Sequence, residues 1–332
     1  MPHPTENLPS PEQILADLKE FIEQAVEENH GSTKPVRPKH RVPFSWPPKA
    51  ISHQYHIPAK SWTDRAEYEA HGEKFPVRVA HTPHGVFGRC EKCWHEARGD
   101  TVEEMLRRLQ KAGEPLFRRQ LAIGKTLGFP GRFVGRISDL APQDLVRLLY
   151  CPDRDVAYEA KLEIEKHASL GVFGPALIHI LRDDRHPHRR SAQWCVLDMM
   201  EDISLILPDE NDQREAIAAM RDLLWNATDD YARAIYKAGV VIGGHLPGQI
   251  GKEVLLECFH APSKYGRRAA MHGVFHVVEW HPTALREIVE RLREASINDP
   301  EPILRRYAAA MADDLEAGRD HGPDPVFPEE EV

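Results

Sequence analysis

The sequence predicts a mainly α-helical protein: a solenoid of five helix pairs, preceded by a small α+β domain whose elements run ββ(β)α. The first observation behind this prediction is a short pattern that returns five times between residues 141 and 318. The second is an alternation of apolar and polar residues, typical of β-strands, between residues 74 and 125. The third is length, because 332 residues exceed the usual size of one domain.

The repeated pattern is a turn-forming residue that opens a helix, followed eight positions later by a small residue. Its five occurrences are Pro152 and Ala160, Pro187 and Cys195, Asp230 and Ala238, Pro262 and Ala270, and Pro300 and Ala308. Shorter apolar helices are predicted between them, at residues 173–181, 216–224, 251–259 and 284–292. The small residues recur every 32 to 43 positions, a period typical of helical solenoids, in which stacked pairs bury each other's apolar faces.

This stretch, about 141–318, resembles the HEAT-repeat family and covers more than half of the chain. The resemblance implies pairs of antiparallel helices whose small residues let neighbouring helices approach closely. It also implies a binding role, since helical solenoids bind partners along their extended surfaces.

The first element in chain order is an amphipathic helix within residues 1–29. Ser10 can cap this helix, and Pro11 is tolerated in its first turn. Its apolar residues recur at spacings of three and four: Ile14, Leu15, Leu18, Phe21, Ile22 and Ala25. Because an isolated helix of this length is marginal in water, we expect the apolar stripe to dock on the protein's own chain or on a partner protein.

Residues 30–73 are predicted to form a basic, proline-rich strap. The stretch 29–63 contains no acidic residue, six lysines or arginines, and six prolines that exclude long helices. The interleaved Phe44, Trp46 and Tyr55 favour a strap laid over the protein's own core. The alternative is an arm that binds RNA or single-stranded DNA through phosphate contacts and base stacking.

Residues 74–125 are predicted to form the α+β domain. The expected elements are a strand at 75–81, a turn at 82–85, strands at 86–90 and 94–98, and a helix opened by Asp100 or Thr101. The segment 75–121, above all the run Gly-Asp-Thr-Val-Glu-Glu that begins at Gly99, resembles the HicB family of antitoxin-like domains. The sequence Glu91-Lys92-Cys93-Trp94 replaces that family's usual proline- and glycine-containing loop, and no toxin-like domain adjoins it. The resemblance therefore implies a fold, and only weakly an antitoxin role.

A joint at residues 126–140 and a tail at 319–332 complete the predicted organisation. A helix is expected at 114–127, ended by the loop at 128–132. Residues 115–138 again lack acids and carry five basic side chains, Arg118, Arg119, Lys125, Arg132 and Arg136. The tail is proline-rich and acidic, a composition typical of disorder.

Two groups of residues have the types of metal ligands. His81, His84, Cys90 and Cys93 could suggest zinc, but a turn at 82–85 would place Cys90 four residues beyond the partner of His81, about 13 Å away. A zinc ion needs its ligands within about 2.3 Å, so we expect no zinc there. We interpret the other group, His272 and His276 one helical turn apart, as part of a solvated polar stripe.

The candidate binding residues stand two positions before each small residue. They are Tyr158, Gln193, Tyr236, Arg268 and Arg306. Stacking of the repeats would align them in a ladder, and tyrosine and arginine are the side chains that anchor protein interfaces. The alternative is that the ladder is half-buried packing between neighbouring repeats.

These observations predict a non-enzymatic scaffold or adaptor that binds another protein and needs no cofactor. One alternative is a nucleic-acid-binding protein that uses segments 29–63 and 115–138, with Arg118 and Arg119 among the contacts; another is a metal-dependent enzyme. A net charge of −9 opposes charge-driven binding to nucleic acid. The five cysteines indicate reduced thiols, and no apolar stretch is long enough to span a bilayer, so we expect a cytoplasmic protein without a membrane partner.

Overall fold

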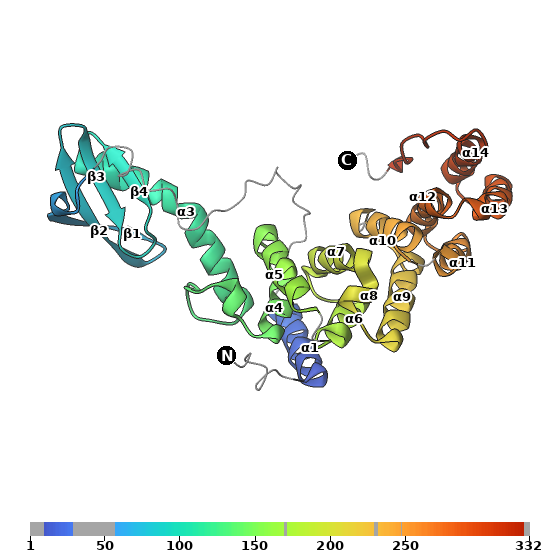
Figure 1. Cartoon of the computed structure of the whole chain (residues 1–332), viewed down its shortest axis with the longest axis horizontal. Helices are drawn as coiled ribbons and strands as arrows, with labels where there is room; N and C mark the ends of the chain where they lie inside the picture. The colour runs from blue at the N-terminus through green and yellow to red at the C-terminus, as the bar shows by residue number, and fades with distance from the viewer. Residues whose placement is uncertain (1–9, 29–56, 169–170, 229–231, 247, 329–332) are drawn as a thin grey trace. The chain divides into compact units, whose positions relative to one another are not determined.

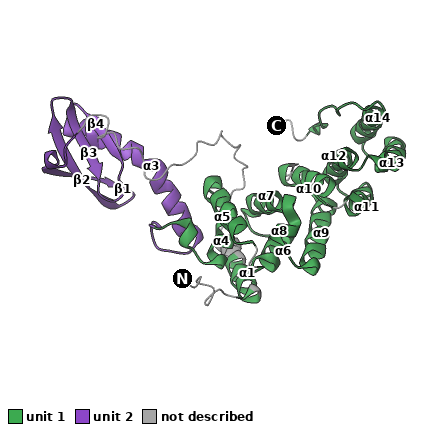
Figure 2. Ribbon diagram, in the orientation of Figure 1, with its two compact units in different colours: residues 1–34, 135–332 green, residues 35–134 purple. Residues whose placement is uncertain are grey.

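The computed structural model describes residues 10–28, 57–168, 171–228, 232–246 and 248–328. The chain divides into two compact units, one of residues 1–34 with 135–332 and the other of residues 35–134 (Figure 2). Helices dominate, and the second unit adds a small four-stranded antiparallel sheet. Most of the predicted strap lies outside the described residues, including Phe44, Trp46 and Tyr55.

The sheet of the second unit is a meander in which each strand pairs with the next along the chain (Figure 1). Its strands are β1 (Asp64–Ala70), β2 (Glu73–Thr82), β3 (Gly85–Cys90) and β4 (Glu96–Gly99). The last three correspond to the predicted strands, and His81 lies opposite Val86 as the predicted turn requires. The strand β1 corrects the prediction, since the sequence placed its residues in the strap.

One helix, α3 (Val102–Thr126), packs its apolar side against this sheet. Thr101 caps it by accepting a hydrogen bond from the Glu104 backbone N–H, while the Glu104 carboxylate accepts one from the Asp100 N–H. Pro115 lies inside the helix and does not end it. The core between helix and sheet includes Phe75 and Phe117, which are both fully buried, with ring centroids 4.4 Å apart.

The first unit is built from helices joined by short turns. They are α1 (Pro11–Glu28), α4 (Pro142–Leu148), α5 (Arg154–Lys166), α6 (Gly174–Arg182), α7 (Arg189–Met199), α8 (Ile203–Ile206), α9 (Glu210–Trp225), α10 (Ala232–Gly244), α11 (Gly248–Cys258), α12 (Lys264–Trp280), α13 (Leu285–Asn298) and α14 (Pro302–Glu316). Short 3-10 turns lie beside some of these helices, at Ile137–Asp139, Met200–Asp202 and Pro282–Ala284, and another, at Ala59–Ser61, precedes β1 in the second unit. Among the described residues, no helix combines the length and apolar character that crossing a membrane requires.

The repeated sequence pattern places helix starts and buried positions correctly. The helices α5, α7, α10, α12 and α14 begin two residues after the five turn-forming residues, of which Asp230 lies outside the described part. The small residues are 0 % exposed in four helices and 3 % exposed at Cys195 in α7. The predicted register of the helix cores is therefore confirmed.

Helix contacts follow the same order. Successive members of the set α5, α7, α10, α12 and α14 contact each other, and each also contacts a preceding helix, respectively α4, α6, α9, α11 and α13. Figure 1 shows these helices side by side in chain order. The N-terminal helix α1 docks on α4 and α6 of its own unit and buries Ile14 and Leu18. Of the two alternatives for its apolar stripe, this is docking on the protein's own chain.

Glycines let α10 and α12 approach each other closely. A Cβ at Gly239 would lie 2.3 Å from the Ala269 carbonyl oxygen, and one at Gly243 would lie 2.0 Å from that of Gly273. Because a side chain at either position would displace the neighbouring backbone, glycine is what lets the two helices approach.

The C-terminal segment departs from the predicted disorder. Residues 319–328 lie against α12 and α14, where Phe327 is 1 % exposed and packs edge-on against Tyr265 at 5.2 Å. Lys264 and Arg268 also lie over the Phe327 ring. The composition of the tail hides this docking, because one buried aromatic residue and a few hydrogen bonds anchor an otherwise polar segment.

Candidate functional site

Side chains from α12, α14 and the C-terminal segment meet in one cluster. We call it the histidine cluster and define it as His272, His276, Glu279, Tyr307, His321 and Asp324. His272 is 2 % exposed, which corrects its interpretation as part of a solvated stripe. The sequence places His272 and His276 on one helix face, and the docked C-terminal segment covers that face.

A chain of hydrogen bonds runs through the cluster from one carboxylate to another. Asp324 Oδ1 lies 3.0 Å from His272 Nδ1, and His272 Nε2 lies 3.2 Å from His276 Nε2. His276 Nδ1 lies 2.8 Å from Glu279 Oε2. The Tyr307 hydroxyl donates a further hydrogen bond to Asp324 Oδ1.

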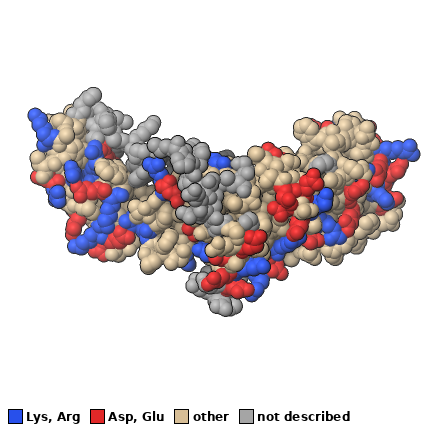
Figure 3. All heavy atoms as spheres, turned by 60° about the horizontal axis from the view of Figure 1, so that its bottom comes forward, with Lys and Arg blue, Asp and Glu red and all other residues tan. Residues whose placement is uncertain are grey.

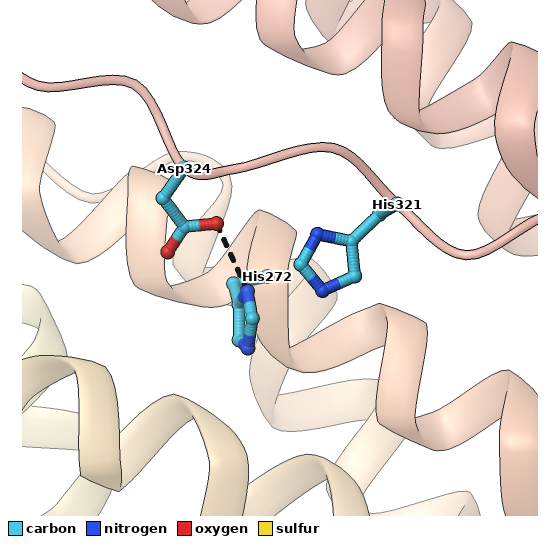
Figure 4. A group of neighbouring side chains, drawn as sticks. All are labelled: His272, His321 and Asp324. Carbon is cyan, nitrogen blue, oxygen red and sulfur yellow. Dashed lines mark hydrogen bonds and ion pairs between the residues drawn. The ribbon is translucent and has the colours of Figure 1, made fainter.

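His321 completes the cluster from the side of the C-terminal segment. Its ring packs edge-on against that of His272, with centroids 4.7 Å apart, and against Phe275 at 4.6 Å. One possible ligand atom from each of His272, His321 and Asp324 lies within 4.8 Å of the others. Figure 4 shows the three side chains converging from the helix and the segment.

The surroundings shift the ionisation of several cluster members. Burial would raise the pKa of Asp324, but the hydrogen bonds from His272 and Tyr307 outweigh it and hold that pKa below its ordinary value. Burial lowers the pKa of His276, with Glu279 acting in the opposite direction. Burial and the charge of Asp324 raise the pKa of Tyr307, which therefore remains a hydrogen-bond donor at neutral pH.

Next to the cluster lies an open pocket of about 480 Å³, here called the aromatic pocket. Its lining residues come from α7, α10, α12 and the C-terminal segment: Trp194, Arg233, Tyr236, Lys237, Arg268, Asp324, Pro325 and Val326. Tyr236 is 42 % exposed at the pocket, and its ring lies 4.4 Å from that of His272. The pocket and the cluster thus share Asp324 and the Tyr236–His272 contact.

The five residues of the predicted ladder lie in different surroundings in the structure. Tyr236 and Arg268 line the aromatic pocket, and Arg268 donates a hydrogen bond to the Pro325 carbonyl. Gln193 is 2 % exposed and donates to the carbonyls of Leu181 and Asp183, which is a packing role.

The remaining ladder positions lie outside the pocket. Tyr158 on α5 is half-buried, with the Lys161 ammonium 5.2 Å from the centre of its ring. Arg306 on α14 is exposed. The ladder is therefore partly surface and partly packing, and its role in binding a partner stays a prediction.

Among the described basic residues of segment 115–138, Arg118 and Arg132 form ion pairs within the second unit. Arg118 donates to Glu114 on the same helix face, and Arg119 is half-buried. Arg132 holds both carboxylate oxygens of Glu73, and its side chain is only 6 % exposed. On the face drawn in Figure 3, acidic and basic side chains are interspersed.

Cys90 and Cys93 are both buried in the core of the second unit. The Tyr68 hydroxyl lies 3.8 Å from Cys90 Sγ. A hydrogen bond from the Cys93 thiol lowers the pKa of Cys90 against the effect of burial, helped by backbone N–H groups of Cys93 and Lys92. These loop N–H groups supply the kind of stabilisation that a helix start gives to a thiolate in other proteins.

Sequence reasoning missed the two cluster members that the C-terminal segment supplies. His321 and Asp324 follow the last repeat in a stretch rich in proline and glycine, where periodicity gives no signal. The available signal was the pairing of His272 with His276 on a helix face. Comparison of the chain with protein-family models, curated proteins and solved structures gives no match.

Proposed function

We propose that the first unit is a HEAT-like solenoid of five helix pairs that binds another protein along α5, α7, α10, α12 and α14. The solenoid is supported by the order of helix contacts and by the buried small residue in each of these helices. The second unit is proposed to resemble HicB domains in fold, because β2, β3, β4 and α3 occur where the resemblance expects them.

The aromatic pocket is the observation that carries the binding proposal. An exposed tyrosine beside a tryptophan, with arginine and lysine at the edge, is the composition that anchors protein interfaces. The pocket is also open, as binding a side chain from another protein requires.

Nearby charge indicates the kind of partner. Arg233 is exposed. The pKa of Arg154 on α5 is lowered first by the burial of Arg154 and second by the positive charge of Arg233. Two arginines close enough to repel each other favour an acidic partner, which relieves the repulsion. We therefore infer a partner segment with an apolar side chain for the pocket and a carboxylate for Arg233.

The test places a photo-crosslinking phenylalanine derivative at position 236 in the full chain, with the same group at exposed Ile297 on α13 as control. We expect a discrete protein adduct from native lysate at position 236 and none at 297. Arg233→Glu should reduce the yield about tenfold, because it reverses the charge at the pocket edge. Equal adducts at both positions would contradict the proposal, and loss of the adduct on nuclease treatment would favour nucleic-acid binding instead.

A further inference from the structure

The histidine cluster contains a hydrogen-bond chain that two neutral histidines cannot complete. Three contacts join Asp324, His272, His276 and Glu279 in sequence, and each contact needs one hydrogen. Ionised carboxylates only accept hydrogen bonds, and two neutral imidazoles carry one N–H each. The chain therefore needs either a third proton on one ring or a cation in place of one proton.

A metal ion on His272 Nδ1 would take the place of that third proton. The lone pair of Nδ1 would then face the ion, and Nε2 would donate to His276 Nε2. His276 Nδ1 would in turn donate to Glu279, so both rings stay neutral and both carboxylates ionised. A metal-bound histidine that donates its other N–H to a partner, which is itself held by a carboxylate, is the usual outer arrangement of metal sites.

The other two ligands converge on the same point. Asp324 Oδ1 is already 3.0 Å from His272 Nδ1, close to the separation of about 3.3 Å between donors on one tetrahedral ion. His321 Nδ1 lies 2.6 Å from the Gly322 carbonyl oxygen, and donating there leaves its Nε2 with the lone pair that a metal requires. The donor atoms lie within 4.8 Å of one another, so binding needs side-chain movements of about 1 Å.

From this geometry we propose that His272, His321 and Asp324 form a zinc site that fixes the C-terminal segment to α12. Two imidazoles and one carboxylate suit zinc, whereas calcium and magnesium prefer oxygen ligands alone. Three protein ligands leave a fourth position for water. Since Asp324 also lines the aromatic pocket, the ion sets the position of one wall of that pocket.

Zinc chloride added to chelator-treated, metal-free full-length protein tests the site, with calorimetry for affinity and elemental analysis for stoichiometry. We expect one ion per chain at this site. His321→Ala should weaken its binding at least about a hundredfold, and His276→Ala, which removes an outer partner, about tenfold. The matched control His260→Ala, an exposed histidine outside the cluster, should leave affinity unchanged.

Limited trypsin digestion measures the consequence for the segment, because Arg319 is the only lysine or arginine in the sequence 319–332. Zinc should slow release of the fragment 320–332 about fivefold or more in the parent protein and not in His321→Ala. Equal helical circular dichroism of the metal-free proteins will show that the variant is folded.

Three results would overturn the proposal. They are the absence of saturable zinc uptake, uptake that survives His321→Ala unchanged, and uptake lost only in Cys90→Ser or Cys93→Ser. The last result would place the ion at the cysteine pair. None of these results bears on the photo-crosslinking at position 236, so the zinc site and the proposed partner stand or fall separately.

Discussion

Two arginine side chains tie the starts of α12 and α14 to the loops before them. Arg267 donates to the carbonyls of Ala261 and Pro262, and Arg305 donates to those of Asp299 and Pro300, five and six positions earlier in each case. Arg267 also forms a buried ion pair with Asp299 of the next repeat. Because truncating one partner of a buried pair leaves an uncompensated charge, Arg267 and Asp299 contribute to structure.

The Glu73–Arg132 pair of the second unit gives a pH prediction. Hydrogen bonds from Arg132, opposed by burial and helped by Lys92, lower the pKa of Glu73 to about 2. A carboxyl with a lowered folded-state pKa stabilises the protein above its ordinary pKa of 4.5 and loses this effect as the pH falls toward 2. Arg132→Gln should therefore destabilise β2 and α3 at pH 7, by about 1–3 kcal/mol, and progressively less below pH 4.5.

Hydrogen exchange of the full chain, read by mass spectrometry on peptides from β2 and α3, measures this difference. Arg107→Gln, an exposed arginine on α3, serves as the matched control. An Arg132→Gln effect that stays constant from pH 7 to about pH 3 would show that the carboxylate is not involved.

At the scale of elements, periodicity predicted most helices, because a buried face repeated every three or four residues is visible in the sequence. The strand β1 was missed because its outward-facing residues are charged, and only Tyr68 and Ala70 are buried. Pro115 suggested a helix boundary, but α3 continues through it. The sequence indicated the members of the histidine cluster that lie on α12. It could not indicate His321 and Asp324, because their positions depend on how the non-periodic C-terminal segment docks.

The close contact between α10 and α12 gives an element-scale prediction. Gly243→Ala should destabilise the first unit by about 1–3 kcal/mol, because the new Cβ would meet the Gly273 carbonyl. Gly244→Ala is the matched control: its Cβ would have only ordinary contacts, and alanine favours helix by up to about 1 kcal/mol. Thermal unfolding followed by circular dichroism distinguishes the two. Equal midpoints for both variants would contradict the predicted contact.

At the scale of the whole molecule, charge argues for a protein partner over nucleic acid. The chain carries 52 acidic and 43 basic residues (Lys and Arg), and Arg118 and Arg132 of segment 115–138 already form ion pairs with Glu114 and Glu73. A long polyanion would thus meet an acidic protein with few available cations in the described part of this region.

We therefore predict that a short nucleic acid binds weakly and dissociates by about 150 mM salt, because few phosphates are neutralised and few counterions released. Fluorescence anisotropy with a labelled single strand, measured across a salt series, gives the slope. A triple variant in which Arg118, Arg119 and Arg136 are changed to glutamine tests whether segment 115–138 binds phosphates. It keeps Arg132, because the ion pair of Arg132 with Glu73 supports the fold. Sub-micromolar binding that persists at 150 mM salt and disappears in the triple variant would support the nucleic-acid alternative.

The docked C-terminal segment has a practical consequence for protein production. A chain shortened to Gly318, the boundary that its composition suggests, would lose Phe327 and uncover the Tyr265 ring and the cations beside it. Because this surface would be exposed, the shortened protein should aggregate more readily and crystallise less readily than the full-length one. A polyhistidine purification tag fused to the C-terminus would also bring competing imidazoles near His321, so the tag belongs at the other end.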